Sequence, residues 1–341
     1  MGAGSAAGFA LVEQSQALTN MRISIVVPTR NRLALLTQAL RAIRLQTHEH
    51  YEVLVIDDGS DAGTRAQYAD LQTALGGKFR FVQVGVDGQR GQGPSASRNL
   101  AIGLAQGDVL AFCDDDDLWL DAGHLVAVAR LFDHHPNVEV CISNQRAVFV
   151  DGTIKEQWLP TLTSVAIDSP TLSERFCLVT TNDLCRSGGF GHLNMICVRR
   201  SVVQAVGGFW EAINYEEDRD FFWRCVDASA AIAYTDTTVA QHHVPDPAQR
   251  VNVSSAIQLQ ERWLVAAMVS QHIAATVKSQ AIAQLCLAHE GDLLRRLAQH
   301  CASQNQPSAS LGLACQALGA RFSFKWAAYC AWAWFKSLRS S

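Results

Sequence analysis

The sequence has no uninterrupted apolar run of about 18 residues, so we predict no transmembrane helix. Residues 1–20 lack both a basic start and a long apolar stretch, and they are rich in Ala, Gly, Ser and Gln. This composition predicts a disordered leader and argues against a signal peptide. The chain has 341 residues, 48% of them hydrophobic, which is enough for one large or two medium domains.

The chain also lacks closely spaced cysteine pairs and an excess of basic charge. Its ten cysteines include no Cys-x-x-Cys pair, which favours reduced thiols in a cytoplasmic protein over a disulfide frame or a zinc site. The formal net charge is -4, and the residues after Asp292 contain six bases and no acid, so the preceding part is more acidic still. This balance argues against a nucleic-acid-binding surface, and we expect no nucleic acid among the partners.

Strands alternating with helices are predicted from residue 22 onward. Short apolar runs at 22–29, 51–57, 79–85 and 108–113 predict buried strands. Helical patterns separate them at 33–43, 63–75 and 96–106, and Gly107 is expected to stop the third helix. This alternation predicts βαβ units on a parallel sheet. Further strand is expected at 138–150, followed by a hairpin turn at Asp151-Gly152 and a helical region from about residue 255.

Polar residues follow three of the predicted strands, at 28–30, 57–58 and 114–117. Ligands of open α/β sheets bind beyond the carboxyl ends of the strands, so these clusters should share one ligand site. The first turn, PTRNR, has none of the glycines that a dinucleotide-binding fold needs there. Four adjacent aspartates could be a solvated acidic face. Their position after a buried strand favours instead an Mg²⁺ or Mn²⁺ ion with a bound nucleotide.

Six motifs resemble those of the family 2 glycosyltransferases in order and spacing, over roughly residues 23–255. They are PTRNR, VIDDGSDAGT, PSASRN, FCDDDDLW, VGGF and EEDRDFFWR. The resemblance implies an α/β protein of the GT-A fold, with a parallel or mixed nucleotide-binding sheet flanked by helices. We expect a nucleotide-sugar-binding half at 21–135, an acceptor-binding half of the same domain at 136–255, and a C-terminal helical region at 256–341.

The resemblance implies an inverting, metal-dependent enzyme that uses Mn²⁺ or Mg²⁺. Such an enzyme transfers a sugar from a nucleoside diphosphate donor, most commonly a UDP-sugar, to a hydroxyl group. A glycan or lipid-linked acceptor of polysaccharide or glycolipid biosynthesis is expected. Two other classes stay open. A nucleotidyltransferase would carry a glycine-rich loop with a lysine after the first strand, and a catalytically silent nucleotide-sugar-binding module would lose the catalytic base.

The nucleotide site implied by the resemblance begins at the first two strand ends. Pro28 and Thr29, with Arg30 at the same strand end, would border the nucleotide. Asp58 would read the base, and Asp57 would support the same strand end.

The aspartate run would continue this site. Asp114 would contact the ribose, and Arg98 would lie near the base and the diphosphate. Asp116 and Asp117 would bind the metal ion. Asp115 is grouped with the substrate-binding residues, but it occupies a slot that is small or variable in the family, so we expect it to matter least.

The resemblance places the catalytic group at Asp218, preceded by Glu217. In inverting members this aspartate removes the acceptor proton; a helix N-cap is the alternative role. His242 or His243 matches a late metal-binding histidine, and a structural role is the alternative. Trp210 would either stack on an acceptor sugar or belong to the core.

The end of the chain, RFSFKWAAYCAWAWFKSLR, is basic and aromatic. As a helix it would gather its four bases in one sector, with aromatic side chains over most of the rest. Such a helix suits peripheral contact with a membrane at the inner face of the plasma membrane. Packing on the protein core is the alternative.

Overall fold

The computed structural model describes residues 19–85, 88–89, 91–166, 169–246, 248 and 257–338. Apart from its last two residues, the expected leader lies outside these ranges, as does the junction at 249–256. All ten cysteines are described, and all are free thiols. Among the described residues, no helix has the length and the apolar character needed to cross a membrane.

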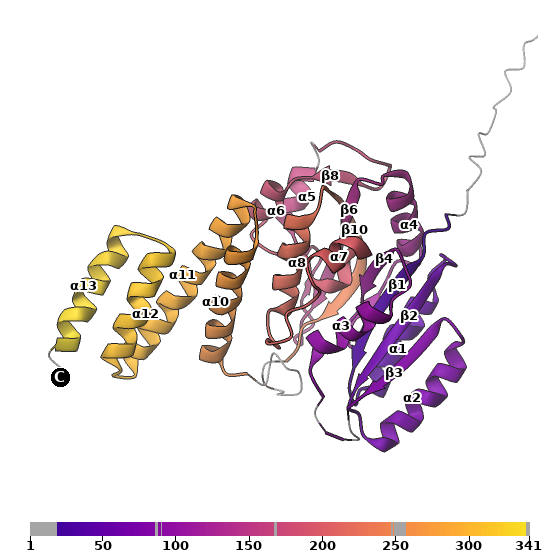
Figure 1. Cartoon of the computed structure of the whole chain (residues 1–341), viewed down its shortest axis with the longest axis horizontal. Helices are drawn as coiled ribbons and strands as arrows, with labels where there is room; N and C mark the ends of the chain where they lie inside the picture. The colour runs from indigo at the N-terminus through magenta and orange to yellow at the C-terminus, as the bar shows by residue number, and fades with distance from the viewer. Residues whose placement is uncertain are drawn as a thin grey trace, which may run out of the picture.

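The described strands form one ten-stranded mixed sheet with the main order β3-β2-β1-β4-β9-β6-β10-β5 (Figure 1). The first four strands are β1 (Ile23–Thr29), β2 (Tyr51–Asp58), β3 (Phe79–Val84) and β4 (Val109–Phe112). They pair in parallel, as the alternation with helices predicted. Their carboxyl ends therefore meet at one edge of the sheet.

The second half of the sheet is mixed. It contains β5 (Leu118–Trp119), β6 (Val138–Val148), β7 (Ile154–Lys155), β8 (Cys177–Val179), β9 (Ile196–Arg199) and β10 (Ala231–His243). β9 lies between β4 and β6 and is antiparallel to both. β6 and β7 form the predicted hairpin, and Gly152 in its turn has a φ of 83°, which glycine adopts readily.

Helices cover both faces of the sheet. They are α1 (Leu33–Arg44), α2 (Ala62–Leu75), α3 (Pro94–Leu104), α4 (His124–His134), α5 (Pro160–Ala166), α6 (Thr181–Arg186), α7 (Arg200–Ala205) and α8 (Glu217–Ala228), with a short 3₁₀ turn, η1 (Leu193–Met195). Alternate residues of β1 face opposite cores: Ile23 and Ile25 pack with α1 and α4, and Val26 packs with α3 and α8.

Four further helices extend to one side of the sheet (Figure 1). They are α10 (Leu259–Thr276), α11 (Gln280–Ser303), α12 (Pro307–Ala320) and α13 (Phe324–Leu338). α10 reaches the main core through Val269 and Ile273, and α11 reaches it through Ile282 and Cys286. All four helices contribute to a second, smaller core. This C-terminal helical region and the mixed α/β sheet confirm the expected fold class.

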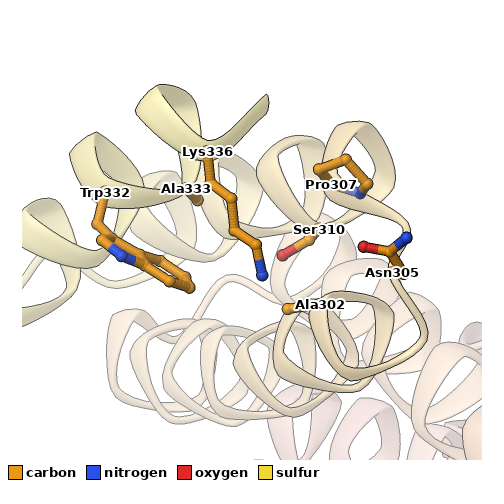
Figure 2. A pocket seen from close by; sticks show the side chains of 7 residues that line it. All are labelled: Ala302, Asn305, Pro307, Ser310, Trp332, Ala333 and Lys336. Atoms are coloured by element: carbon orange, nitrogen blue, oxygen red, sulfur yellow. The ribbon is translucent and has the colours of Figure 1, made fainter. Parts of the chain in front are cut away.

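One face of α13 packs on α12, where Trp326 donates a hydrogen bond to the Ala314 carbonyl at 2.9 Å. Its other face exposes aromatic side chains, including Trp332, Trp334 and Phe335. A pocket of about 10 Å³ lies beneath Trp332 and Lys336 (Figure 2). That volume holds about one water molecule, so we assign no ligand to it.

The third helix ends earlier than expected, and Gly107 is not its stop. α3 ends at Leu104, and Ala105 is already extended. Gly107 lies against β1, where an added Cβ would come within 2.5 Å of the Ser24 nitrogen. The glycine is therefore needed for close approach to a strand.

Candidate functional site

The carboxylate of Asp57 holds the turn after β2. It is fully buried, and its oxygens accept hydrogen bonds from the Ser60 amide at 3.0 Å and from Arg65 Nε at 3.2 Å. Arg30, at the end of β1, donates to the Gly59 carbonyl at 3.4 Å. These contacts fit the supporting role expected for Asp57 and join the first two strand ends.

Asp58 faces the loop that leads into α3. Its two carboxylate oxygens accept the backbone N–H groups of Gln92 and Gly93, each at 2.9 Å. Gly91 allows this approach, because an added Cβ would lie 1.9 Å from the Asp58 carboxylate. Each carboxylate oxygen has a second lone pair, so Asp58 can still accept a hydrogen bond from a ligand.

Arg98 connects the aspartate run to the start of α8. It donates to Asp114 at 2.7 Å and to Glu217 at 3.0 Å, and its guanidinium lies 5.4 Å from the centre of the Phe209 ring. Burial alone would raise the pKa of Asp114, but the charge and hydrogen bond of Arg98, together with His192 and His242, lower that pKa. Asp114 and Arg98 are therefore both charged, and they fix the end of β4 against α8.

Asp115 makes more contacts than we expected for a position that is small or variable in the resembled family. It is 5% exposed and accepts hydrogen bonds from Thr29 Oγ1 at 2.7 Å and from Arg32 at 2.9 Å. Burial raises its pKa, although Arg32 acts in the opposite direction. Asp115 therefore joins the end of β4 to the end of β1, next to Pro28, and its carboxylate faces the protein.

Asp116 and Asp117 carry the strongest indication of a cation. Burial and then the charges of Asp117 and Asp115 raise the pKa of Asp116 to about 7. A nearby cation would favour the ionised carboxylate. Asp117 is 1% exposed; its oxygens accept the His243 amide at 2.8 Å and lie 2.9 Å from His242 Nδ1.

The two histidines at the end of β10 have different roles. The ring of His242 faces the Asp117 carboxylate, whereas the ring of His243 contacts the backbone carbonyl of Asp116 at 2.7 Å. Burial lowers the pKa of His242, but the hydrogen bond to Asp117 and the charges of Asp117, Asp114 and Asp116 together raise it. Of the two, His242 has the geometry of a metal ligand.

His192 is a member of this cluster that the sequence did not indicate. Suitable atoms of Asp117, His192 and His242 all lie within 4.8 Å of one another. His192 follows three glycines at 188–191, a segment we expected only to be irregular, and no spacing rule relates it to the other two positions. Burial and the neighbouring His242 lower the pKa of His192 to about 4, so its ring is neutral. The carboxylates of Asp116 and Asp117 and the imidazoles of His192 and His242 are ligand types that suit a divalent cation.

Asp218 lies in the first turn of α8 and is partly exposed. The helix N-cap is Glu216, with a φ of 64°, so the alternative that Asp218 is the N-cap is wrong. Burial, then Glu217 and Glu216, raise the pKa of Asp218 to about 7. A carboxylate with a near-neutral pKa is suited to general base chemistry.

Trp210 is anchored from the C-terminal region. One face of its ring stacks on His272 of α10, with ring centres 4.2 Å apart. His272 Nδ1 lies 2.7 Å from the buried carboxylate of Asp220, which also accepts from Arg224. An acceptor sugar therefore could stack only on the opposite face of Trp210.

A cleft of about 630 Å³ opens beside Asp116, between the start of α1 and the residues after β10. Arg32, Leu35, His243 and Pro245 contribute to its walls. This volume is in the range of small-molecule sites.

Comparisons with known proteins match this chain to glycosyltransferases. A family model described as glycosyl transferase family 2 matches residues 24–207. An uncharacterised glycosyltransferase of Rickettsia conorii is 36% identical over 104 residues, which are 30% of this chain and 16% of that protein. The chain spans less than two thirds of the length of the curated relatives it matches.

Two groups of solved structures share the fold. S. aureus TarS 1-349 in complex with UDP-GlcNAc has a TM-score of 0.64 at 18% identity, covering 88% of this chain and 81% of TarS 1-349. The mannosyltransferase PcManGT from Pyrobaculum calidifontis, in complex with GDP-Man and Mn²⁺, has a TM-score of 0.55 at 17% identity. The match covers 93% of this chain and 81% of PcManGT. At this identity the likeness shows the fold.

Proposed function

Because the chain belongs to glycosyl transferase family 2, we propose that it transfers a sugar from a nucleoside diphosphate donor to an acceptor hydroxyl, with inversion at the anomeric carbon. The observation that carries this proposal is the Arg98 bridge. It joins Asp114, at the nucleotide edge of the sheet, to Glu217, which immediately precedes Asp218. A nucleotide-binding edge and a carboxylate base are thereby held together.

The donor nucleotide lies across the strand ends in this proposal. Pro28, Thr29 and Arg30 border it, Asp58 accepts a hydrogen bond from the base, and Asp114 accepts one from the ribose. Asp57 and Arg98 hold these groups in place through the buried contacts described above. We propose a UDP-sugar as the donor, because TarS shares the fold and its complexes hold UDP-GlcNAc and UDP.

A divalent cation, Mn²⁺ or Mg²⁺, fits among Asp116, Asp117 and His242. When bound, such an ion neutralises charge on the diphosphate leaving group. PcManGT was solved with Mn²⁺, which supports a metal-dependent reaction for this fold.

Asp218 acts as the base. Its carboxylate takes the proton of the acceptor hydroxyl as that oxygen bonds to the anomeric carbon. The bond from that carbon to the diphosphate oxygen breaks, and the nucleoside diphosphate leaves with the electron pair. We propose that residues 21–135 hold the donor and that residues 136–255 shape the acceptor side, where a glycan or a lipid-linked glycan binds.

We also infer that α13 meets an anionic membrane surface, which would place the enzyme at the inner face of the plasma membrane. Trp334 and Phe335 are 50% and 61% exposed, and no acid follows Asp292. Exposed aromatic side chains with basic neighbours suit the interface of such a membrane.

Thermal unfolding with a panel of UDP- and GDP-sugars, each with Mn²⁺, tests the donor proposal. A donor that binds the native state raises the melting temperature, by an amount that grows with its concentration. As a second result, we expect the wild type to transfer the sugar. Asp218→Asn should lose transfer but still bind UDP. If no nucleotide sugar stabilises the chain, the proposed function is wrong.

A further inference from the structure

His192 is a buried imidazole for which the proposed reaction gives no role. It lies just before η1, is only 8% exposed, and its ring centre is 4.5 Å from that of His242. With Asp117, these rings form the group whose donor atoms lie within 4.8 Å of one another. The three side chains come from three separate segments and surround one small volume.

The surroundings of the His192 ring indicate that it binds a ligand. Its Nδ1 is buried but has no hydrogen-bond partner within the described part of the chain, and a buried polar atom without a partner costs free energy. Trp158 packs edge-on against both His192 and His242, with ring centres 5.7 and 5.8 Å away. The two imidazoles are therefore held in place beside each other.

The segment that carries His192 also orients the carboxylate. Asn194, two residues later, donates its side-chain amide to Asp117 and accepts the backbone N–H of Asp114 at 3.0 Å. Such outer contacts fix ligand orientation in metal sites. Gly191 lets this segment pack against α8, because an added Cβ would lie 2.7 Å from the Phe222 ring.

We propose that His192 is a fourth protein ligand of the divalent cation, beside Asp116, Asp117 and His242. This inference deepens the proposed function and rests on it. Asp117 Oδ2 and His242 Nδ1 are 2.9 Å apart, and adjacent ligands of one metal with bonds of about 2.1 Å have a similar separation.

Two imidazoles change which ion the site selects. Mg²⁺ prefers oxygen ligands and usually depends on substrate phosphates, whereas imidazole nitrogen favours first-row transition ions. A site with two imidazoles and two carboxylates therefore selects Mn²⁺ or Co²⁺ over Mg²⁺. Because the chain supplies all four of these ligands, it binds the ion before the nucleotide arrives.

Titration of the metal-free full chain with Mn²⁺, without nucleotide, tests this assignment. Electron paramagnetic resonance follows free Mn²⁺, and we expect one bound ion that equimolar Mg²⁺ does not displace. His192→Phe keeps a ring between Trp158 and His242 but has no donor atom, so it should weaken Mn²⁺ binding at least about tenfold. Pulsed measurements on bound Mn²⁺ should detect two imidazole nitrogens in the wild type and one in the variant.

His134→Ala, which removes an exposed histidine of α4, is the matched control and should bind Mn²⁺ like the wild type. His192→Ala is the second variant, with folding of each checked by circular dichroism. Unchanged Mn²⁺ affinity in a folded His192 variant overturns the assignment. Detection of only one imidazole nitrogen on Mn²⁺ bound to the wild type also overturns the assignment, even if neither variant folds. Displacement of Mn²⁺ by equimolar Mg²⁺ overturns the proposed selectivity. Binding through His192 without sugar transfer supports the assignment and contradicts the proposed function alone.

Discussion

Neighbouring aspartates at the end of β4 have different electrostatic environments. The Arg98 charge lowers the pKa of Asp114 despite burial, whereas burial and neighbouring carboxylates raise that of Asp116 to about 7. Asp115 lies between them and faces Thr29 and Arg32. The charge of each carboxylate therefore follows from its burial, its neighbours in the run and the side chains that pair with it.

Asp115→Ala should destabilise the protein by about 1–3 kcal/mol, because it removes the buried acceptor of Thr29 and one of the two carboxylates that pair with Arg32. Urea unfolding measures the change. Asp116→Asn is the matched comparison and should keep or raise the free energy of unfolding, since burial and the repulsion of Asp117, Asp115 and Asp114 outweigh the ion pair of this carboxylate with Arg32. Equal stability of Asp115→Ala and the wild type would show that the buried network contributes little.

The transfer rate should fall as the pH drops below about 7, because the base must be ionised and burial with Glu217 and Glu216 raises the pKa of Asp218 to about 7. Glu216→Gln removes one of the two negative neighbours, so the acidic limb of the kcat/KM profile should move to lower pH. A limb that does not move in this variant would remove Asp218 as the titrating group.

The same shift predicts a change in stability with pH. The pKa of Asp218 rises from 3.8 to about 7 on folding, so its contribution to stability is complete below pH 3.8 and is lost as the pH rises through about 7. Asp218→Asn cannot ionise. It should therefore melt at a higher temperature than the wild type above pH 7, in thermal scans at several pH values. A lower melting temperature there would mean that the carboxylate stabilises the start of α8.

Single residues could be predicted from the sequence where a strand end determines their position. Asp58, Asp114 and Asp116 fall at one sheet edge because β2 and β4 are buried parallel strands on either side of β1. His192 could not be predicted in this way. Its position depends on the packing of an irregular segment against α8, which no local pattern of residues encodes.

At the scale of elements, the turn between β3 and α3 depends on glycine. Gly91→Ala should weaken UDP binding and lower stability, because the added Cβ would collide with Asp58. Gly103→Ala, inside α3 where nothing lies within 4 Å of an added Cβ, is the matched control. It should be neutral or stabilising by up to about 1 kcal/mol. Calorimetry of UDP and thermal unfolding measure both variants; equal effects would exclude the collision.

The exposed face of α13 gives a second prediction for an element. Trp334→Ser with Phe335→Ser should reduce binding to vesicles that contain anionic lipid, because the two rings supply apolar area to the interface. Leu45→Ser, at an exposed position after α1, is the control. Flotation of the protein with neutral and anionic vesicles measures the difference. Equal flotation of the double variant and the wild type would assign this face to another role.

Elements were predicted best where hydrophobic periodicity is long. The spacing of Leu36, Leu40 and Ile43 is one face of a helix, and α1 buries these residues. The short strand β8 leaves too few residues for periodicity to be recognised, and the antiparallel direction of β9 follows from its partners β4 and β6. Tertiary pairing determines this half of the sheet.

At the scale of the molecule, the helical region is joined to the main core through α10 and through Ile282 and Cys286 of α11. α10 contributes Val269 and Ile273 to the core that contains Phe221 of α8. His272 of the same helix stacks on Trp210 and contacts Asp220. All four helices of the region also contribute to the smaller core.

This attachment has a consequence for dividing the chain. A shortened protein that ends at residue 255, where the family resemblance ends, would lose the apolar cover of α8 and leave Asp220 without one of its partners. A cut after Thr276 keeps the contacts of α10 but removes Ile282 and Cys286 of α11 from the same core. α10 and the start of α11 are thus part of the catalytic module, and a hybrid enzyme that exchanges C-terminal regions would have to be joined beyond them.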